Sequence, residues 1–367
     1  MRNLKRTLSL ALASVMLVGM MSVGASAVNA SDFTDADEIV NKDAVSTMTA
    51  LGIINGKEDG SYFDPTGNVT RAEMAKMLCV AINGGVDPVL GVKDTPTFTD
   101  IKGTWAESYI EYCAANGIIA GRGNNKFDPT GTVSATEAAK MLLGVLGYNA
   151  EKSGLVGNDW AINTNVLANQ NGLYKNLANL NANTLLTRDN AAQMIYNALD
   201  ANMVELNAAG NYTTSQYSYT GTESVVTGTE RVWVVKIKDS SVNDAVKALD
   251  GSVYNSRQDA IDTLKDANGG TTLDTGKYTL EQKTQNVYGE NTVTKYADET
   301  MGHKYLSLIT DGDAVLTDVE KDSKGTYTLY MNGITTKGQY TKVEGDYSNL
   351  IGQKVEVLYK DSENVYG

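Results

Sequence analysis

Residues 69–78 read VTRAEMAKML, and the same pattern returns as VSATEAAKML at 133–142 and as LTRDNAAQMI at 186–195. Each copy is a short polar turn that leads into an apolar stripe. In the first copy Met74, Met77, Leu78 and Ala81 follow the i, i+3, i+4, i+7 spacing of one helical face. A lone two-helix unit cannot bury such a face, so the three copies predict helical units that pack together.

Longer repeats surround these stretches, at 33–83 and 98–147. Both open with Phe-Thr-Asp, continue through Gly-Ile-Ile and reach Phe-Asp-Pro-Thr-Gly before the second helix. A looser third copy at 155–200 keeps Trp-Ala and Thr-Arg but lacks the Phe-Thr-Asp opening and the Phe-Asp-Pro-Thr-Gly loop. Each repeat predicts a helix, a glycine-bounded loop and a second helix, with Gly117 as the left-handed C-cap of one first helix.

The composition changes after the repeats, and 211–367 is predicted to be β-rich. Tyr, Thr and Val alternate there between glycine turns, and Asn332-Gly333 is a hairpin signal. Residues 241–266 predict one or two short helices. The expected fold class is therefore multidomain α + β, with an all-α N-terminal part followed by a β-rich region.

The N-terminus predicts an exported protein. Residues 1–27 join a basic start, an apolar stretch and Ala-Ser-Ala, the pattern of a cleaved signal peptide. No later segment is long and apolar enough to span a bilayer, so the mature chain is expected to have no membrane span. Among the 367 residues the formal charge is −13, which makes nucleic acid a poor partner.

Few residues suit metal or nucleophilic chemistry. Cys79 and Cys113 both lie in apolar helical patterns and are expected to be small buried hydrophobes, although a disulfide between them stays possible. His303 is the single histidine and is expected to be exposed, so neither a zinc site nor a Ser/His/Asp set is supported. Residues 57–64 and 311–313 lack the full spacing of a calcium loop. We expect no metal and no cofactor.

The tandem motifs resemble the S-layer homology (SLH) family. The resemblance covers about 33–200 and rests on Phe-Thr-Asp, Trp-Ala, Gly-Ile-Ile-x-Gly, Phe-Asp-Pro and Thr-Arg-Ala-Glu occurring together. It implies three repeats in a pseudo-threefold helical prism with grooves between them. It also implies non-covalent attachment to the cell wall through a secondary wall polysaccharide, often one that carries pyruvate ketals.

No repeat carries the whole family set. Repeat 1 has no Trp-Ala, repeat 2 has Ala135 where the family has arginine, and repeat 3 has no recognisable Asp opening. Fewer than three working grooves are therefore expected.

The helix starts contain a structural signal and an additional cation. Thr70 and Glu73 have the Thr-x-x-Glu spacing of a capping box, and Ser134 with Glu137 repeats it. Capping does not require a cation in the first turn, which opposes the helix macrodipole. With the resemblance, Arg71 and Arg188 are interpreted as receptors for the anionic polymer; the alternative is a salt bridge to an Asp of a neighbouring repeat.

The remaining candidate residues each have a structural interpretation beside the functional one. Trp105 and Trp160 either pack between repeats or offer a platform for sugar stacking. Asp35 and Asp100 are expected to order the turn before the first helix, with a secondary role in ligand binding. Gly56 and Gly121 are expected to serve backbone conformation and to let a ligand approach closely.

Two functions are compatible with the sequence. The first is a non-catalytic surface protein of the cell wall, anchored by its repeats and in contact with other surface-layer subunits. The second is an anchored extracellular enzyme whose β-rich region cleaves glycans with paired carboxylates. The small, β-modular character of 211–367 favours the first.

Overall fold

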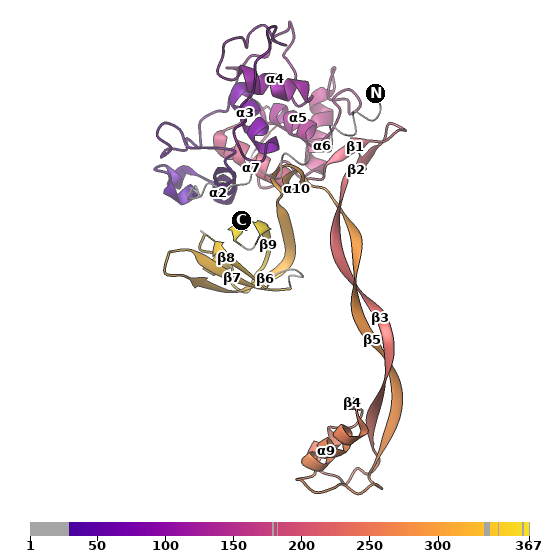
Figure 1. Cartoon of the computed structure of the whole chain (residues 1–367). Helices are drawn as coiled ribbons and strands as arrows, with labels where there is room; N and C mark the ends of the chain where they lie inside the picture. The colour runs from indigo at the N-terminus through magenta and orange to yellow at the C-terminus, as the bar shows by residue number, and fades with distance from the viewer. Residues whose placement is uncertain are drawn as a thin grey trace. The chain divides into compact units, whose positions relative to one another are not determined.

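The computed structural model describes residues 29–177, 180, 181, 183–333, 338–343, 345–361 and 363–366, and for 311–313 it describes the backbone only. The expected signal peptide at 1–27 and the side chains of the acidic stretch at 311–313 lie outside this description. Within the described residues, no helix has both the length and the apolar character that a bilayer crossing needs. The fold is mixed, with helices in the repeats and antiparallel sheets in the C-terminal half (Figure 1).

The chain forms two compact units, Met1–Gln216 with Asp298–Gly367, and Tyr217–Ala297. The first unit begins with the short turns η2 (Ala30–Asp32) and η3 (Ala36–Glu38). Two helices then come from each repeat: α2 (Lys42–Ala50) and α3 (Arg71–Ile82), α4 (Glu107–Ala115) and α5 (Ala135–Val145), α6 (Trp160–Gln170) and α7 (Arg188–Leu199).

The helix boundaries follow the predicted signals. Thr70 and Ser134 each accept a hydrogen bond from the amide three residues on, and Glu73 and Glu137 complete both capping boxes. Thr187 caps α7 in the same way, with Asn190 in the place of the glutamate. Gly117 ends α4 at φ +72°, the left-handed conformation predicted for it.

The helices pair between repeats. The second helix of each repeat packs against the first helix of another, as α3 with α4, α5 with α6, and α7 with α2. The segments before the three second helices also bond to one another. Val69 N–H donates to Leu186 O at 2.8 Å, Leu186 N–H to Val133 O at 2.8 Å, and Val133 N–H to Val69 O at 2.9 Å. These three bonds form a closed cycle that joins the repeats.

The last seventy residues belong to the same unit as the helices. After the short pair β1 (Val204–Leu206) and β2 (Tyr212–Thr214), the chain returns through α10 (Met301–Leu306) to a five-stranded sheet of order β10-β9-β6-β7-β8. Its members are β6 (Ile309–Lys321), β7 (Tyr327–Asn332), β8 (Gln339–Val343), β9 (Lys354–Asp361) and β10 (Asn364–Val365), with η4 (Ser348–Leu350) before β9. Met301, Leu306, Leu308 and Leu358 are part of the buried core of the repeats.

The second unit is a long ribbon with a small folded end. β3 (Gln216–Ile237) lies beside β5 (Tyr278–Asp298), and the contacts Gln216–Asp298 and Glu230–Gln285 show that they run in opposite directions. The folded end holds α8 (Asp244–Lys247), β4 (Val253–Tyr254) and α9 (Arg257–Ala267) over its own buried core.

The expected glycine turns in this ribbon are wrong. Gly221 and Gly228 lie inside β3 rather than between strands. A methyl group on Gly221 would come within 2.7 Å of the Lys295 side chain, so this glycine makes room for a neighbouring strand.

The two cysteines are buried, and the histidine is half-buried. Cys79 and Cys113 are buried and free, as small hydrophobes are expected to be. A hydrogen bond with Cys79 and burial raise the pKa of the Cys113 thiol. His303 is half-buried on α10, where its Nδ1 lies 3.6 Å from Glu299 Oε1, so its expected exposure is wrong.

Candidate ligand-binding site of the repeats

An aspartate holds the Phe-Asp-Pro loop in each of the first two repeats. Asp35 accepts hydrogen bonds from Phe63 N at 2.9 Å and Asp64 N at 2.7 Å. Asp100 does the same for Phe127 N at 2.9 Å and Asp128 N at 2.8 Å. Burial alone would raise the pKa of Asp100, but these amide hydrogen bonds outweigh it and lower the pKa. Both aspartates thus order the loop that precedes the second helix of their repeat, whereas the sequence predicts that they order the turn before the first helix.

The two arginines at the helix starts join one repeat to another. Arg71 is 3% exposed, donates from Nε to Phe127 O at 2.7 Å and from Nη2 to Ala120 O at 2.7 Å, and lies 4.4 Å from the Phe127 ring centroid. Arg188 is 5% exposed and repeats this arrangement with Phe63 O and Asn55 O, both at 2.8 Å. Their main partners are backbone carbonyls.

Capping does not require the helix-start arginine, but folding uses it in another way. Each of the two arginines supports the loop of a neighbouring repeat. The alternative, a salt bridge to a neighbouring Asp, is not what the described contacts show, because Arg71 pairs with Glu137 at 3.6 Å. The positions equivalent to Arg71 and Glu137, one repeat further along, are Ala135 in repeat 2 and Asn190 in repeat 3. The arginine and the glutamate of this ion pair are therefore both absent there.

Two further cations lie near Arg71, and one of them lies over a tryptophan ring. Arg122 donates to Glu137 Oε1 at 2.7 Å and to Asp128 Oδ2 at 2.7 Å. Lys140, on α5, places Nζ 5.2 Å from the centroid of the half-buried Trp160 ring. Burial lowers the pKa of Lys140, and the positive charge of Arg71 lowers it further against the opposing effect of Glu137. We call the set Arg71, Arg122, Glu137, Lys140 and Trp160 the Lys140 cluster.

The equivalent lysine of repeat 1 has a different environment. Lys76 Nζ lies 2.9 Å from Asp87 Oδ2 and 5.3 Å from the centroid of the Tyr109 ring. The hydrogen bond that Lys76 donates to Asp87 raises the pKa of Lys76, although burial opposes this shift. Trp105 is 61% exposed and its ring lies 6.3 Å from that of Tyr109, so this indole is presented to solvent rather than packed between repeats.

The third junction, between α7 and α2, lacks both the lysine and the tryptophan at the equivalent positions. Gln193 takes the lysine position on α7 and bonds to Asn197, and the exposed Val40 precedes α2 where the other repeats have Trp105 and Trp160. Asn41 closes this junction by donating from its backbone N and its Nδ2 to the carboxylate of Asp189, at 3.1 and 2.6 Å. The three junctions therefore present three different surfaces.

Gly56 and Gly121 are required by close packing and not by an unusual φ. A methyl group on Gly56 would meet Gly60 O at 2.2 Å, and one on Gly121 would meet Lys126 O at 2.6 Å. The expected conformational role is therefore wrong in detail, because neither glycine has a positive φ.

Lys140, Lys76 and Arg122 are the residues that sequence reasoning missed. A signal for the lysines exists, since lysine is the eighth residue of both VTRAEMAKML and VSATEAAKML and glutamine replaces it in LTRDNAAQMI. Within the described residues, no group of three or more His, Cys, Asp or Glu side chains could hold a metal ion.

Comparison with known proteins agrees with the repeats. The S-layer homology domain model matches residues 32–75 and 97–139. These two segments are S-layer homology domains. The third copy at 155–200 lies outside the matched segments, although its helices occupy the third place in the hydrogen-bond cycle.

Proteins of similar sequence include surface proteins and an exoglucanase. An S-layer protein of Bacillus licheniformis is 32% identical over 111 residues, which are 30% of this chain and 12% of the relative. A cell surface protein of Thermoanaerobacter kivui is 28% identical over 207 residues, 56% of this chain and 26% of the relative. An exoglucanase of Acetivibrio thermocellus is 29% identical over 156 residues, 40% and 14% of the two chains. The chain thus spans about a quarter or less of these relatives, and the matches indicate an exported protein of the cell wall surface.

Proposed function

We propose that this SLH protein is a non-catalytic surface protein, held non-covalently on the bacterial cell wall by a secondary polysaccharide attached to peptidoglycan. The observation that carries the proposal is the Lys140 cluster. It places Lys140 over the Trp160 ring, with Arg71 and Arg122 joined to Glu137 nearby, in a chain whose formal charge is −13. An anionic sugar needs such a pairing, because the cations offset its charge and the indole packs on the ring.

We also infer that the repeats form a pseudo-threefold prism. The closed cycle of hydrogen bonds through Val69, Val133 and Leu186 supports this inference, and so does the pairing of each second helix with the first helix of another repeat. The unequal side chains at the junctions support fewer than three working sites.

Each candidate residue has a role in this proposal. Lys140 and Trp160 contact the polymer, and Trp105 offers a second sugar platform. Arg71 contributes positive charge while it positions the loop beside Lys140, and Arg188 does the same at its own junction. The loop residues Asp35, Asp100, Gly56 and Gly121 act through the shape of the Phe-Asp-Pro loops.

Wall sedimentation tests the proposal. Purified protein should sediment with native cell-wall sacculi and remain in solution with sacculi stripped of their polysaccharide. Lys140→Met keeps the helix and the apolar stem but removes the charge, and it should weaken co-sedimentation about tenfold. The matched control Lys76→Met removes an equivalent lysine that Asp87 already neutralises, and it should have a smaller effect.

Two results would contradict the proposal. Equal sedimentation with stripped walls would show that the polysaccharide is not the ligand. Equal loss in the two lysine variants, with both still folded, would show that overall charge and not the Lys140 cluster governs binding.

The alternative, an anchored carbohydrate-active enzyme, has support from the exoglucanase relative. Release of reducing sugar from purified wall glycan or xylan by the full chain would establish that alternative. No release, with wall binding intact, is the outcome that the present proposal expects.

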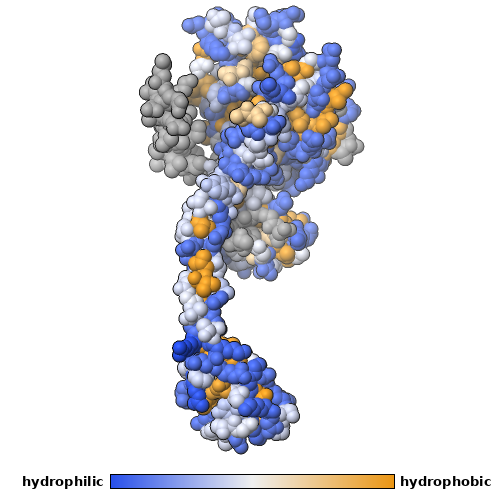
Figure 2. All heavy atoms as spheres, turned by 90° about the vertical axis from the view of Figure 1, so that its right-hand side faces the viewer, coloured by the Kyte–Doolittle hydropathy of each residue, from blue (hydrophilic) through white to orange (hydrophobic). Residues whose placement is uncertain are grey.

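Other surface-layer subunits are the second proposed partner, and the ribbon of β3 and β5 is the candidate contact. Tyr219, Val226, Tyr288 and Tyr296 are exposed along it, and Figure 2 shows hydrophobic patches on its surface. Two-stranded ribbons have unpaired edges that another chain can join. Sedimentation velocity should show concentration-dependent association that disappears when 217–297 are deleted; a monomer at all concentrations would exclude self-association.

A further inference from the structure

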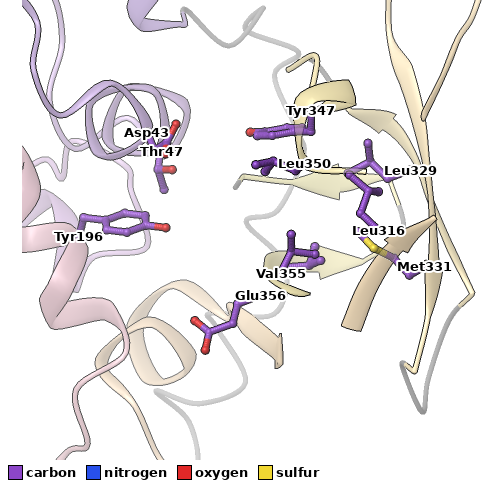
Figure 3. A pocket seen from close by; sticks show the side chains of 11 residues that line it. Asp43, Thr47, Tyr196, Leu316, Leu329, Met331, Tyr347, Leu350, Val355 and Glu356 are labelled. Atoms are coloured by element: carbon purple, nitrogen blue, oxygen red, sulfur yellow. The ribbon is translucent and has the colours of Figure 1, made fainter. Parts of the chain in front are cut away.

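A cavity of about 220 Å³ lies away from the Lys140 cluster, inside the first unit. One wall comes from α2 and α7, which contribute Thr47 and Tyr196, and the other is the apolar face of the C-terminal sheet, including Leu316 and Val355. Figure 3 shows the two walls facing each other, with Tyr196 directed from its helix into the space between them. The cavity therefore has one polar and one apolar side.

Specific contacts fix these walls. Thr47 Oγ1 donates to Tyr366 O at 2.8 Å, which ties α2 to the end of the chain. Thr310 Oγ1 donates to Asp200 Oδ1 at 3.1 Å, which ties β6 to the end of α7. Leu358 of β9 is buried in the core of the repeats. Since the sheet shares this core, the cavity is part of the folded unit.

The polar groups of the cavity are acidic or phenolic. Asp43 and Glu356 are exposed at its rim, and the rings of Tyr196 and Tyr347 are half-buried beside them. Burial, followed by the charges of Asp200, Asp43 and Glu356, raises the pKa of Tyr196 to about 12. Burial and Asp43 also raise the pKa of Tyr347, so both phenols are neutral at physiological pH.

No positive side chain lines this cavity among the residues that the structure describes. Burial raises the pKa of Asp200 at the adjoining end of α7, and the positive charge of Lys175 opposes this shift. Asp43 and Glu356 therefore leave the rim with two negative charges next to two aromatic rings.

We propose that this cavity binds a small organic cation with an apolar body, such as a primary alkylammonium. The ammonium group lies at the rim, between the carboxylates of Asp43 and Glu356 and the faces of the two tyrosine rings, as cations do in aromatic sites. The alkyl chain packs against the leucine and valine side chains of the sheet. The volume is below the roughly 300–1,000 Å³ of pockets for drug-sized ligands, which restricts the ligand to a small one.

Calorimetric titration of the full chain tests this assignment with three probes of one shape: hexylammonium, hexanol and hexanoate. Hexylammonium should bind tightest and hexanoate weakest. The double variant Asp43→Asn, Glu356→Gln should weaken hexylammonium at least about fivefold and leave hexanol unchanged. The control Glu281→Gln, Glu290→Gln removes two exposed charges from the ribbon and should change neither affinity. Val355→Phe should fill the cavity and abolish binding of both probes.

Several results would overturn the proposal. No binding of hexylammonium to the folded chain would show that the cavity holds only water. Equal affinity for hexylammonium and hexanol would show an apolar hole without cation recognition. Equal weakening by the two charge variants would show a general effect of net charge. None of these readouts depends on wall binding, so failure here is distinct from failure of the proposed function.

Discussion

At the scale of single residues, one side chain serves both folding and the proposed site. Arg71 starts a helix in one repeat and holds two carbonyls in the loop of another, 56 and 49 residues away in sequence. A guanidinium can span both oxygens because its donors have a fixed fork geometry. Its burial means that it acts on a ligand mainly through charge and position, while the half-buried Lys140 stays closer to solvent.

Replacing Arg71 should therefore destabilise the repeats. Arg71→Ala leaves Phe127 O and Ala120 O without their donors, and we expect a loss of about 2–4 kcal/mol in the free energy of unfolding. Arg71→Lys should recover little of it, since a single ammonium cannot bridge the two carbonyls. Urea unfolding followed by circular dichroism measures both, with the exposed Arg231→Ala as control. A loss below about 0.5 kcal/mol would mean that the contact does not support folding.

Asp100 should make stability depend on pH in a definite direction. Its pKa in the fold is lowered from the ordinary 3.8, so the folded state binds fewer protons than the unfolded chain around that pH. Its stabilising effect is complete above the ordinary pKa and is lost as the pH falls through the lower, folded value. The melting temperature of Asp100→Asn should be below wild type at pH 7, and the difference should shrink below about pH 4. Glu151→Gln is the matched charge control, and a difference that grew in acid would contradict the assignment.

At the scale of elements, the sequence predicts local structure well and long-range structure poorly. Capping boxes at Thr70 and Ser134 and the left-handed Gly117 are decided within a few residues, so their patterns are sufficient. The pairing of helices between repeats, the partners of Arg71 and the Lys140 cluster depend on residues far apart in sequence. Local rules also fail to predict the extended backbone at Gly221, because the glycine there makes room for the Lys295 side chain of a neighbouring strand.

The third repeat offers a test of the capping argument. Thr187 caps α7 by accepting from Asn190 N, but asparagine replaces the glutamate that reaches back to Thr70 N at 2.8 Å and to Ser134 N at 3.0 Å in the other repeats. Asn190→Glu should restore the box and raise the free energy of unfolding by about 0.5–1 kcal/mol. No new ion pair with a helix-start arginine should contribute, since Ala135 occupies that place.

The neutral variant Asn190→Gln separates the two sources of this gain. It can make the same hydrogen bond without the charge that favours a helix N-terminus. It should therefore stabilise the chain by a smaller amount in the same urea experiment. Destabilisation by both variants would show that the half-buried site cannot accept a longer side chain.

At the scale of the whole molecule, the boundary between the two compact units does not lie where the amino-acid composition changes. The β-rich region at 211–367 was expected to stand apart from the repeats. Residues 298–367 instead belong to the same compact unit as the helices, whereas 217–297 form a unit with a core of their own. Hydrophobic pattern alone cannot reveal this, because Met301, Leu306 and Leu358 would look the same in a separate domain.

Two deletions should therefore have different effects on stability. Gln216 and Asp298 lie side by side, with Gln216 Nε2 donating to Asp298 Oδ1 at 3.1 Å, so an Asn-Gly link can close the chain in place of 217–297. This shortened protein should unfold at the same temperature as the first unit of the full chain. Truncation after Ala297 removes fewer residues than this internal deletion, but it takes away the four apolar side chains that complete the core of the repeats. Each of those side chains contributes about 1.5–3 kcal/mol when buried, so the truncated protein should melt well below the internally shortened one in differential scanning calorimetry. Equal melting temperatures would mean that the repeats fold without the C-terminal sheet, and the cavity between them would then lose its basis as a built site.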